Sequence, residues 1–189
     1  MDPVPAEAGK SSFALLDPEL LFAALPLHAV RRALDLGCGA GAYTLALARR
    51  LPPGGTVFGV DLWEEGVEAL LRAAKREGLS NVTARAGDLT RLPELRDARA
   101  DLALMATVLH DLAARGAAGA ALEEAARVLR PGGWLAAVEF KKIPTQPGPP
   151  LAIRLAPGDL SALAGPAGFA EPVVVDLGPS LYLALFSRC

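Results

Sequence analysis

Short apolar runs alternate along most of the chain with segments in which apolar side chains recur at helical spacing. The apolar runs predict strands at 32–37 (RALDLG), 56–61 (TVFGVD), 82–88 (VTARAGD), 100–108 (ADLALMATV) and 134–140 (WLAAVEF). The helical spacing predicts helices at 42–51, 63–78 and 122–130, each ended or followed by glycine or proline. Strands that alternate with helices form right-handed crossovers, so these five strands are predicted to be parallel.

The pattern changes after residue 140. Residues 141–150 (KKIPTQPGPP) predict a proline-rich loop, and residues 157–169 predict a short helix with a break. Residues 173–187 predict two strands joined at Gly178-Pro179. This connection is too short for a parallel crossover, so the two strands are expected to form a closing hairpin.

One helix is predicted before the first strand. Residues 1–12 are polar and contain proline and glycine, which predicts a flexible arm. Asp17, Pro18 and Glu19 then supply a capping side chain, a proline suited to the first turn and an acid near the positive helix end. Pro26 ends this helix, which is expected to cover one edge of a site.

Composition excludes several function classes. The chain has 189 residues, of which 52% are hydrophobic and 21% charged, as in globular domains. A net charge of −2 gives no electrostatic argument for nucleic acid, and no apolar run reaches the roughly 18 residues that span a bilayer. No secretory signal is visible, and two cysteines cannot form a disulfide framework or a metal cluster. We therefore expect a cytoplasmic protein without a metal site.

A glycine-rich stretch, Asp35-Leu-Gly-Cys-Gly-Ala-Gly41, lies between the first predicted strand and the next helix. Glycines at such a turn let the backbone approach a ligand closely, and open α/β sheets bind ligands at this edge. Asp61 ends the second strand, where a carboxylate can accept hydrogen bonds from both ribose hydroxyls. The alternative to a nucleotide site is a tight turn between strand and helix, with Asp61 as a capping acid. Nucleotide binding is favoured, because the strand before the glycines, the helix after them and the acid at the end of the next strand all occur together.

The residues around the glycines bear on the kind of nucleotide. Ala42 occupies the third glycine position of the dinucleotide fingerprint and is an allowed variant there, so spacing alone does not exclude a dinucleotide. Asp35 argues against one, because an anion is poorly placed beside a pyrophosphate. A ligand with an ammonium and a sulfonium suits this acid better, which indicates S-adenosylmethionine.

Five stretches carry a resemblance to the class I S-adenosylmethionine-dependent methyltransferases. They are LDLGCGAGAYT, VFGVD, AGDLTRLP, ADLALMATVLHDL and RVLRPGGWLAAVEF. The chain resembles most the small bacterial members related to the ubiquinone/menaquinone biosynthesis (type 11) methyltransferases. The resemblance implies an α/β, Rossmann-like seven-stranded sheet with strand order 3-2-1-4-5-7-6, strand 7 antiparallel and helices on both faces. It also implies S-adenosylmethionine as cofactor and S-adenosylhomocysteine as product.

The resemblance also implies cofactor-binding roles at the matching positions. These are Asp35, Gly37, Cys38, Gly39 and Gly41 at the methionine part, Asp61 and Leu62 at the ribose and the adenine face, Asp88 and Leu89 at the adenine, and Thr107 and Val108 at the amino group. Two of these residues have structural alternatives. Cys38 would pack as a small residue, and Asp88 would cap a helix that follows the third strand.

His110 follows the fourth strand at the mouth of the predicted site, where an imidazole is suited to act as a general base. A structural hydrogen bond at a helix start, with Asp111 as the cap, is the alternative. His28 is expected to be structural. On the substrate side we expect Phe13, Phe140, Lys141 and Arg154, with the proline-rich loop as a lid. Lys141 would neutralise an anionic substrate or is a solvated loop charge.

The predicted function is methyl transfer from S-adenosylmethionine to a small-molecule acceptor by in-line displacement. No large insertion flanks the sixth strand, so the acceptor is small, or a second subunit of a homodimer completes the pocket. Two cysteines are too few for arsenite methylation. One alternative is an inert S-adenosylmethionine-binding module that acts as a sensor or partner subunit. Another, a nicotinamide-dependent oxidoreductase, lacks a Tyr-x-x-x-Lys pair.

We expect a single methyltransferase domain over residues 1–189. Its parts are an N-terminal arm and helix (1–30), a cofactor-binding core (31–140), and a substrate-side loop, helix and closing hairpin (141–189).

Overall fold

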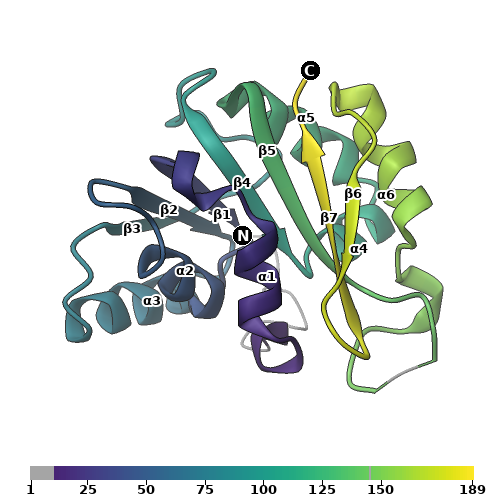
Figure 1. The fold of residues 1–189 in the computed structure, drawn as a ribbon, viewed down its shortest axis with the longest axis horizontal. Coiled ribbons are helices and arrows are strands. Elements are labelled where there is room, and N and C mark those ends of the chain that lie inside the picture. The colour runs from purple at the N-terminus through teal and green to yellow at the C-terminus, as the bar shows by residue number, and fades with distance from the viewer. Residues whose placement is uncertain (1–10, 145) are drawn as a thin grey trace.

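The computed structural model describes residues 11–144 and 146–189, which form a seven-stranded sheet with helices on both faces (Figure 1). The strands are β1 (Arg32–Leu36), β2 (Thr56–Asp61), β3 (Val82–Ala86), β4 (Ala100–Ala106), β5 (Leu129–Phe140), β6 (Val173–Asp176) and β7 (Leu181–Ser187). Their order is β3-β2-β1-β4-β5-β7-β6, with β1 to β5 parallel and β7 antiparallel to both neighbours. The predicted fold class, strand order and hairpin are confirmed.

Two apolar cores fill the spaces between the sheet and its helices. The helices are α1 (Pro18–Ala24), α2 (Ala42–Ala48), α3 (Glu64–Arg76), α4 (Leu109–Ala114), α5 (Ala118–Val128) and α6 (Pro157–Ala164), with short 3-10 turns η1 (Ser12–Leu15), η2 (Leu27–Ala29), η3 (Leu151–Ile153) and η4 (Gly165–Ala167). Leu47 of α2 and Leu70 of α3 pack in one core. Leu122 of α5 and Leu160 of α6 pack in the other. Both faces of the sheet are therefore covered, which leaves its carboxyl edge for a ligand.

The local sequence explains where α1 begins and ends. The Asp17 side chain accepts a hydrogen bond from the Glu19 backbone N–H at 2.9 Å, and Pro18 lies in the first turn. Leu25 caps the other end, directly before Pro26. Both predicted ends of this helix are confirmed.

One alternative and one prediction about the segments around β4 are wrong. Residues 87–99 form turns, so no helix follows β3, and the alternative in which Asp88 caps such a helix is excluded. The Arg127 guanidinium holds these turns in place, because it donates hydrogen bonds to the carbonyls of Leu92 and Leu95, both at 2.9 Å. α5 ends at Val128 and β5 begins at Leu129, five residues before its predicted start. The reason is that Leu129 pairs with Ala100 of β4, and Gly132 and Gly133 pair with the end of the chain.

The predicted flexible arm is wrong at Ser12. This residue belongs to η1 and is only 5% exposed. Its hydroxyl has hydrogen-bond partners in α2 and after β4, which fix its position. Residues 1–10 of the predicted arm lie outside the described residues.

Candidate functional site

A cavity of about 630 Å³ lies at the carboxyl end of the parallel strands. The loops after β1 to β4, the end of β5, η1 and the segment 146–150 all contribute to its wall. Its size is typical of a small-molecule site. Among the predicted cofactor residues, those that line it are Gly37, Gly39, Asp61, Leu62, Asp88, Leu89, Thr107 and Val108. His110 and Phe140 line the same cavity.

The loop after β1 turns through three glycines with positive φ angles, 92° at Gly37, 50° at Gly39 and 91° at Gly41. A side chain at Gly41 would overlap Leu70, and one at Gly37 would meet Val108 at 3.0 Å. Gly39 differs, because no heavy atom lies within 4 Å of the position that its Cβ would take. Since Gly39 also lines the cavity, its backbone is open to a ligand.

Asp61 joins the end of β2 to this loop. One carboxylate oxygen accepts a hydrogen bond from the Gly39 backbone N–H, and the other accepts one from the Trp63 backbone N–H, both at 2.8 Å. A carboxylate oxygen accepts more than one hydrogen bond, so both oxygens keep capacity for hydroxyl donors. The side chain is thus held in place at the cavity wall and can still bind a ribose.

Asp35 and Cys38 lie in the interior beside the loop and do not line the cavity. One oxygen of Asp35 accepts a hydrogen bond from the Thr44 hydroxyl at 2.5 Å, and the other has no partner. Burial raises the pKa of Asp35 to about 7. Cys38 packs against Gly59, and burial raises the pKa of its thiol. Cys38 is therefore surrounded as a small packed residue would be, in agreement with its structural alternative.

Three residues frame the part of the cavity that follows β2 and β3. Leu62 is 38% exposed and presents an apolar surface, while Leu89 is buried. Asp88 is exposed, and one of its oxygens accepts a hydrogen bond from the Thr90 backbone N–H at 2.8 Å. The two leucines and one carboxylate suit a flat base that carries an amine.

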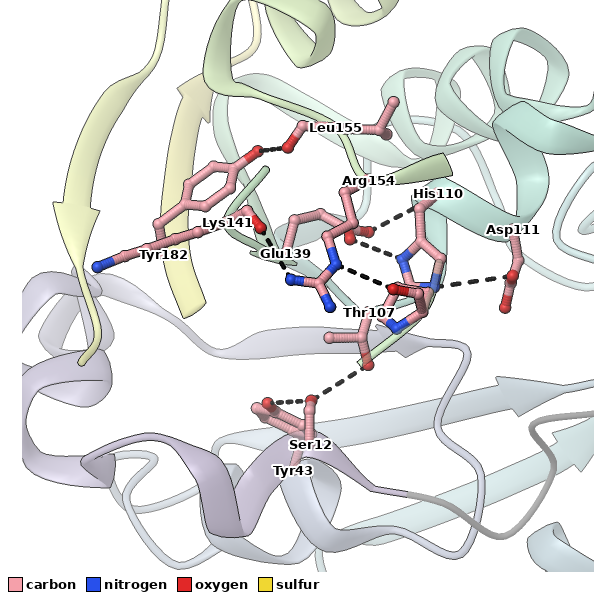
Figure 2. A network of polar contacts seen from close by, with 11 residues as sticks. Ser12, Tyr43, Thr107, His110, Asp111, Glu139, Lys141, Arg154, Leu155 and Tyr182 are labelled. Carbon is pink, nitrogen blue, oxygen red and sulfur yellow. Dashed lines mark hydrogen bonds and ion pairs between the residues drawn. The ribbon is translucent and has the colours of Figure 1, made fainter. Parts of the chain in front are cut away.

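A chain of hydroxyl groups fastens η1 to the cavity wall (Figure 2). The Ser12 hydroxyl lies 2.8 Å from the Tyr43 hydroxyl and 3.1 Å from that of Thr107. Thr107 has a left-handed φ of 53°, which is unusual for a threonine. Ser12 and Tyr43 were not among the predicted site residues, and no local pattern in the sequence relates them.

His110 and Glu139 form a buried pair at the cavity (Figure 2). Glu139 accepts two hydrogen bonds from His110, one from the ring Nδ1 at 2.7 Å and one from the backbone N–H at 3.2 Å. Burial opposes the charged imidazole, but the hydrogen bond and the charge of Glu139 outweigh it, so the pKa of His110 lies above its ordinary value. Nε2 is left as the ring nitrogen that can take up a proton.

Glu139 was not among the predicted site residues either. The available signal was topological, since β4 and β5 are adjacent and parallel. A residue just after β4 and a residue at the end of β5 therefore meet at the same edge of the sheet.

The other predicted substrate-side residues are placed differently. Phe140 lines the cavity with its ring centroid 6.2 Å from that of His110. Phe13 and Lys141 do not line the cavity. The Phe13 ring packs edge-on against Tyr43 with a centroid distance of 4.9 Å, and Lys141 pairs with an aspartate of β6. Arg154 lies behind the wall and is 2% exposed. His28 is in η2, outside the site.

Within residues 11–144 and 146–189, no group of three or more histidine, cysteine or carboxylate side chains could hold a metal ion. None of the helices in that part of the chain is long and apolar enough to cross a membrane.

The fold and the site together define a class of protein. A parallel sheet with a glycine loop after its first strand, an acid after its second and a cavity over both is a Rossmann-like nucleotide-binding fold. Residues 34–137 also match the family model described as "Methyltransferase domain". The chain therefore belongs to this family, as a class I S-adenosylmethionine-dependent methyltransferase, which confirms the resemblance inferred from its motifs.

Individual relatives agree with this assignment. A crystal structure of a S-adenosylmethionine-dependent methyltransferase from Aquifex aeolicus superposes with a TM-score of 0.86 at 27% identity, over 96% of this chain and 95% of that one. The 27-O-demethylrifamycin SV methyltransferase of Amycolatopsis mediterranei is 36% identical over 125 residues, which are 66% of this chain and 44% of that protein. The demethylmenaquinone methyltransferase of Staphylococcus aureus is 34% identical over 116 residues, 61% of this chain and 45% of that protein. The match thus spans less than half the length of these two curated relatives.

S-adenosylmethionine is the cofactor of this family, and the residues of the cavity fit it. The open backbone at Gly39 leaves room for a ligand against the loop. The carboxylate of Asp61, which lines the cavity, suits ribose hydroxyls. Asp35 lies behind the loop with one unpartnered oxygen, so it would favour a cationic group through charge and not through contact.

Proposed function

We propose that this chain transfers a methyl group from S-adenosylmethionine to a small-molecule phenol or alcohol, with His110 as the general base. The observation that carries the proposal is that Gly37 and Gly39 of the glycine loop line the same cavity as His110, which Glu139 binds from behind. A methyl donor against the loop and an acceptor beside His110 would then share the same cavity.

The proposed cofactor site follows the family resemblance. Asp61 accepts hydrogen bonds from the ribose hydroxyls. Leu62 and Leu89 pack on the adenine, and Asp88 faces the adenine amine. Gly37 and Gly39 border the methionine part, while Thr107 and Val108 lie near its amino group. Asp35, Cys38 and Gly41 act from behind the loop, the first through charge and the other two through packing.

The proposed chemistry needs little besides position and one proton acceptor. When bound, S-adenosylmethionine supplies a methyl group on a positively charged sulfur, which leaves with the electron pair of the broken carbon–sulfur bond. As the acceptor oxygen bonds to the methyl carbon, its proton passes to Nε2 of His110. Glu139 stabilises the imidazolium that results and holds the ring by Nδ1.

The raised pKa of His110 supports this role, because it makes the neutral imidazole a stronger base. Phe140 and the prolines of 146–150 add apolar wall beside it, which excludes water from the transfer. The same wall suits an acceptor that is partly apolar.

The setting of the enzyme is part of the proposal. We place it in the cytoplasm, in agreement with the free thiols of Cys38 and Cys189. Residues 1–189 are proposed to act as one methyltransferase domain. A homodimer is the alternative way to complete the acceptor pocket, and acceptor binding that appears only in dimeric fractions on a sizing column would favour it.

The experiment uses S-adenosylmethionine labelled in its methyl group, incubated with the protein and an extract of small metabolites. We expect label in a small-molecule product and an equal amount of S-adenosylhomocysteine. His110→Ala should lower the rate roughly 10²–10⁴-fold. His28→Ala is the matched control, because His28 is the only other histidine and is exposed.

Two outcomes would contradict the proposal. If the wild-type protein binds S-adenosylhomocysteine but labels no product, the inert binding module is the correct alternative. If calorimetry shows tighter binding of NADH than of S-adenosylhomocysteine, the result supports the oxidoreductase alternative.

A further inference from the structure

The cavity wall formed by 146–150 is fastened from behind by one buried side chain. Arg154 follows η3, and its guanidinium donates hydrogen bonds to three carbonyls of the loop 141–150. Nη1 binds the carbonyl oxygens of Lys141 at 3.2 Å and Ile143 at 2.7 Å, and Nε binds that of Pro149 at 3.0 Å. The two ends of the loop are thus held by the same group (Figure 2 shows Arg154 beside the His110–Glu139 pair).

The loop is wrapped closely around this guanidinium. The Arg154 Cζ lies 5.5 Å from the ring centroid of Phe140, which lines the cavity. A Cβ at Gly148 would lie 2.7 Å from the Arg154 Nη2 and 2.9 Å from the Phe140 ring. Backbone, guanidinium and ring are therefore in direct contact, so the position of Arg154 sets the position of the wall.

The charge of Arg154 also acts on His110, the proposed base. His110 shares helix α4 with Asp111, and Arg115, which follows this helix, is exposed at the cavity. Glu139 of β5 is the nearest carboxylate. The charged residues of α5 lie elsewhere, since Glu124 and Arg127 bind the segment 92–97 and Glu123 is exposed.

These charges act on His110 in opposite directions. Glu139 and Asp111 favour the imidazolium, and Arg154 disfavours it. A guanidinium stays charged throughout the range in which histidine titrates, so its effect is constant. It limits the rise in the pKa of His110 that Glu139 causes.

We propose that Arg154 is a positioning residue of the methyl-acceptor site, which holds the 146–150 wall in place and offsets the negative charge that Glu139 exerts on His110. The inference deepens the proposed function, because it takes His110 as the base. Arg154 itself does not line the cavity and therefore acts through the wall and through His110.

Two variants separate the two roles. Arg154→Lys keeps the charge but cannot bind three carbonyls with one planar group, and Arg154→Met removes both. The first measurement is trypsin cleavage in the loop, after Lys142. We expect cleavage to be about tenfold faster or more in both variants, because a loop that opens can adopt the extended conformation that a protease must bind. Cleavage after Arg76, at the end of α3, is the internal control and should not change.

The second measurement is an NMR titration of the two histidines, with exposed His28 as the reference. Arg154→Met should raise the pKa of His110 by about half a unit or more, while Arg154→Lys should leave it near the wild-type value. A merely structural role would speed cleavage without separating the two variants in this titration.

The proposal is overturned if Arg154→Lys is cleaved in the loop at the wild-type rate, or if both variants titrate His110 at the same pH. If Arg154→Met does not fold, Arg154→Lys still carries the loop test, and Arg154→Gln, which also removes the charge, takes its place in the titration with the same rise in the pKa of His110 expected. None of these readouts needs a methyl acceptor. Failure of the proposed function would appear separately, as wild-type protein that transfers no labelled methyl group.

Discussion

Both carboxylate oxygens of Glu139 accept hydrogen bonds from His110, one from the ring and one from the backbone. The carboxylate is fully buried, so this pairing replaces the water that a charge would otherwise need. It also fixes which ring nitrogen carries the proton, because Nδ1 must donate to the carboxylate. A residue at the end of β5 thus sets the chemistry of a residue that follows β4.

Replacing this carboxylate by an amide tests that relationship. Glu139→Gln keeps the shape and one acceptor but removes the charge that raises the pKa of His110. We expect the pKa of His110 to fall, measured by NMR with His28 as the unchanged reference. The stability that the raised pKa confers is present at low pH and is lost as pH rises through that pKa, so it should shrink in the variant. An unshifted His110 resonance would contradict the coupling.

The glycine loop allows a comparison between neighbouring positions. Gly39→Ala places a methyl group in open space at the cavity wall, so the fold should survive with about 1–2 kcal/mol of backbone strain. Affinity for S-adenosylhomocysteine should fall about tenfold or more, measured by calorimetry, because the methyl group occupies the ligand's space. Gly41→Ala is the contrast, since its side chain would overlap Leu70 and should lower the melting temperature instead. Equal affinity of wild type and Gly39→Ala would show that no ligand lies against this loop.

Asp61 is expected to contribute directly to cofactor affinity. Asp61→Ala should weaken binding of S-adenosylhomocysteine by about 1–3 kcal/mol, the loss of hydrogen bonds to a charged group. Asp61→Asn keeps one hydrogen-bond acceptor, so its affinity should lie between those of wild type and Asp61→Ala. Glu68→Ala removes one negative charge from the exposed face of α3 and is the control. Unchanged affinity in Asp61→Ala would rule out the ribose assignment.

The sheet and the glycine loop could be predicted because their signals are local. Apolar runs marked the strands, and three glycines with Asp35 and Asp61 marked the cofactor edge. Such signals need only neighbouring residues in the chain, and they sufficed for the family and the fold. The predicted start of β5 was wrong because pairing with Ala100 of β4 and with the end of the chain, both distant in sequence, decides it.

The acceptor side could not be predicted in the same way. Ser12 binds a hydroxyl 95 positions away, and His110 binds a carboxylate 29 positions away. Arg154 had been expected at the opening, yet its partners are backbone carbonyls, which have no sequence signature. The strand order places His110 and Glu139 at the same edge of the sheet, but the contacts of Ser12 and Arg154 come from segments outside the sheet, which the strand order does not place.

The buried carboxyl of Asp35 predicts a dependence of stability on pH. Burial, partly opposed by the Thr44 hydrogen bond, raises its pKa from 3.8 to about 7. As pH rises from about 4 to about 7, the unfolded chain releases this proton while the folded chain keeps it, so the free energy of unfolding falls. With about 1.4 kcal/mol for each pH unit, the loss reaches roughly 4 kcal/mol at most.

Asp35→Asn removes that ionisation while keeping the size of the side chain. We expect the variant to gain stability relative to wild type as pH rises from about 4 to about 8, measured by urea unfolding at each pH. Glu68→Gln, at an exposed position, should instead run parallel to wild type across the range. Parallel curves for Asp35→Asn would mean that the carboxyl ionises as easily in the folded chain as in water. The unpartnered oxygen beside the glycine loop would then already be solvated, and a cationic ligand would gain little from it.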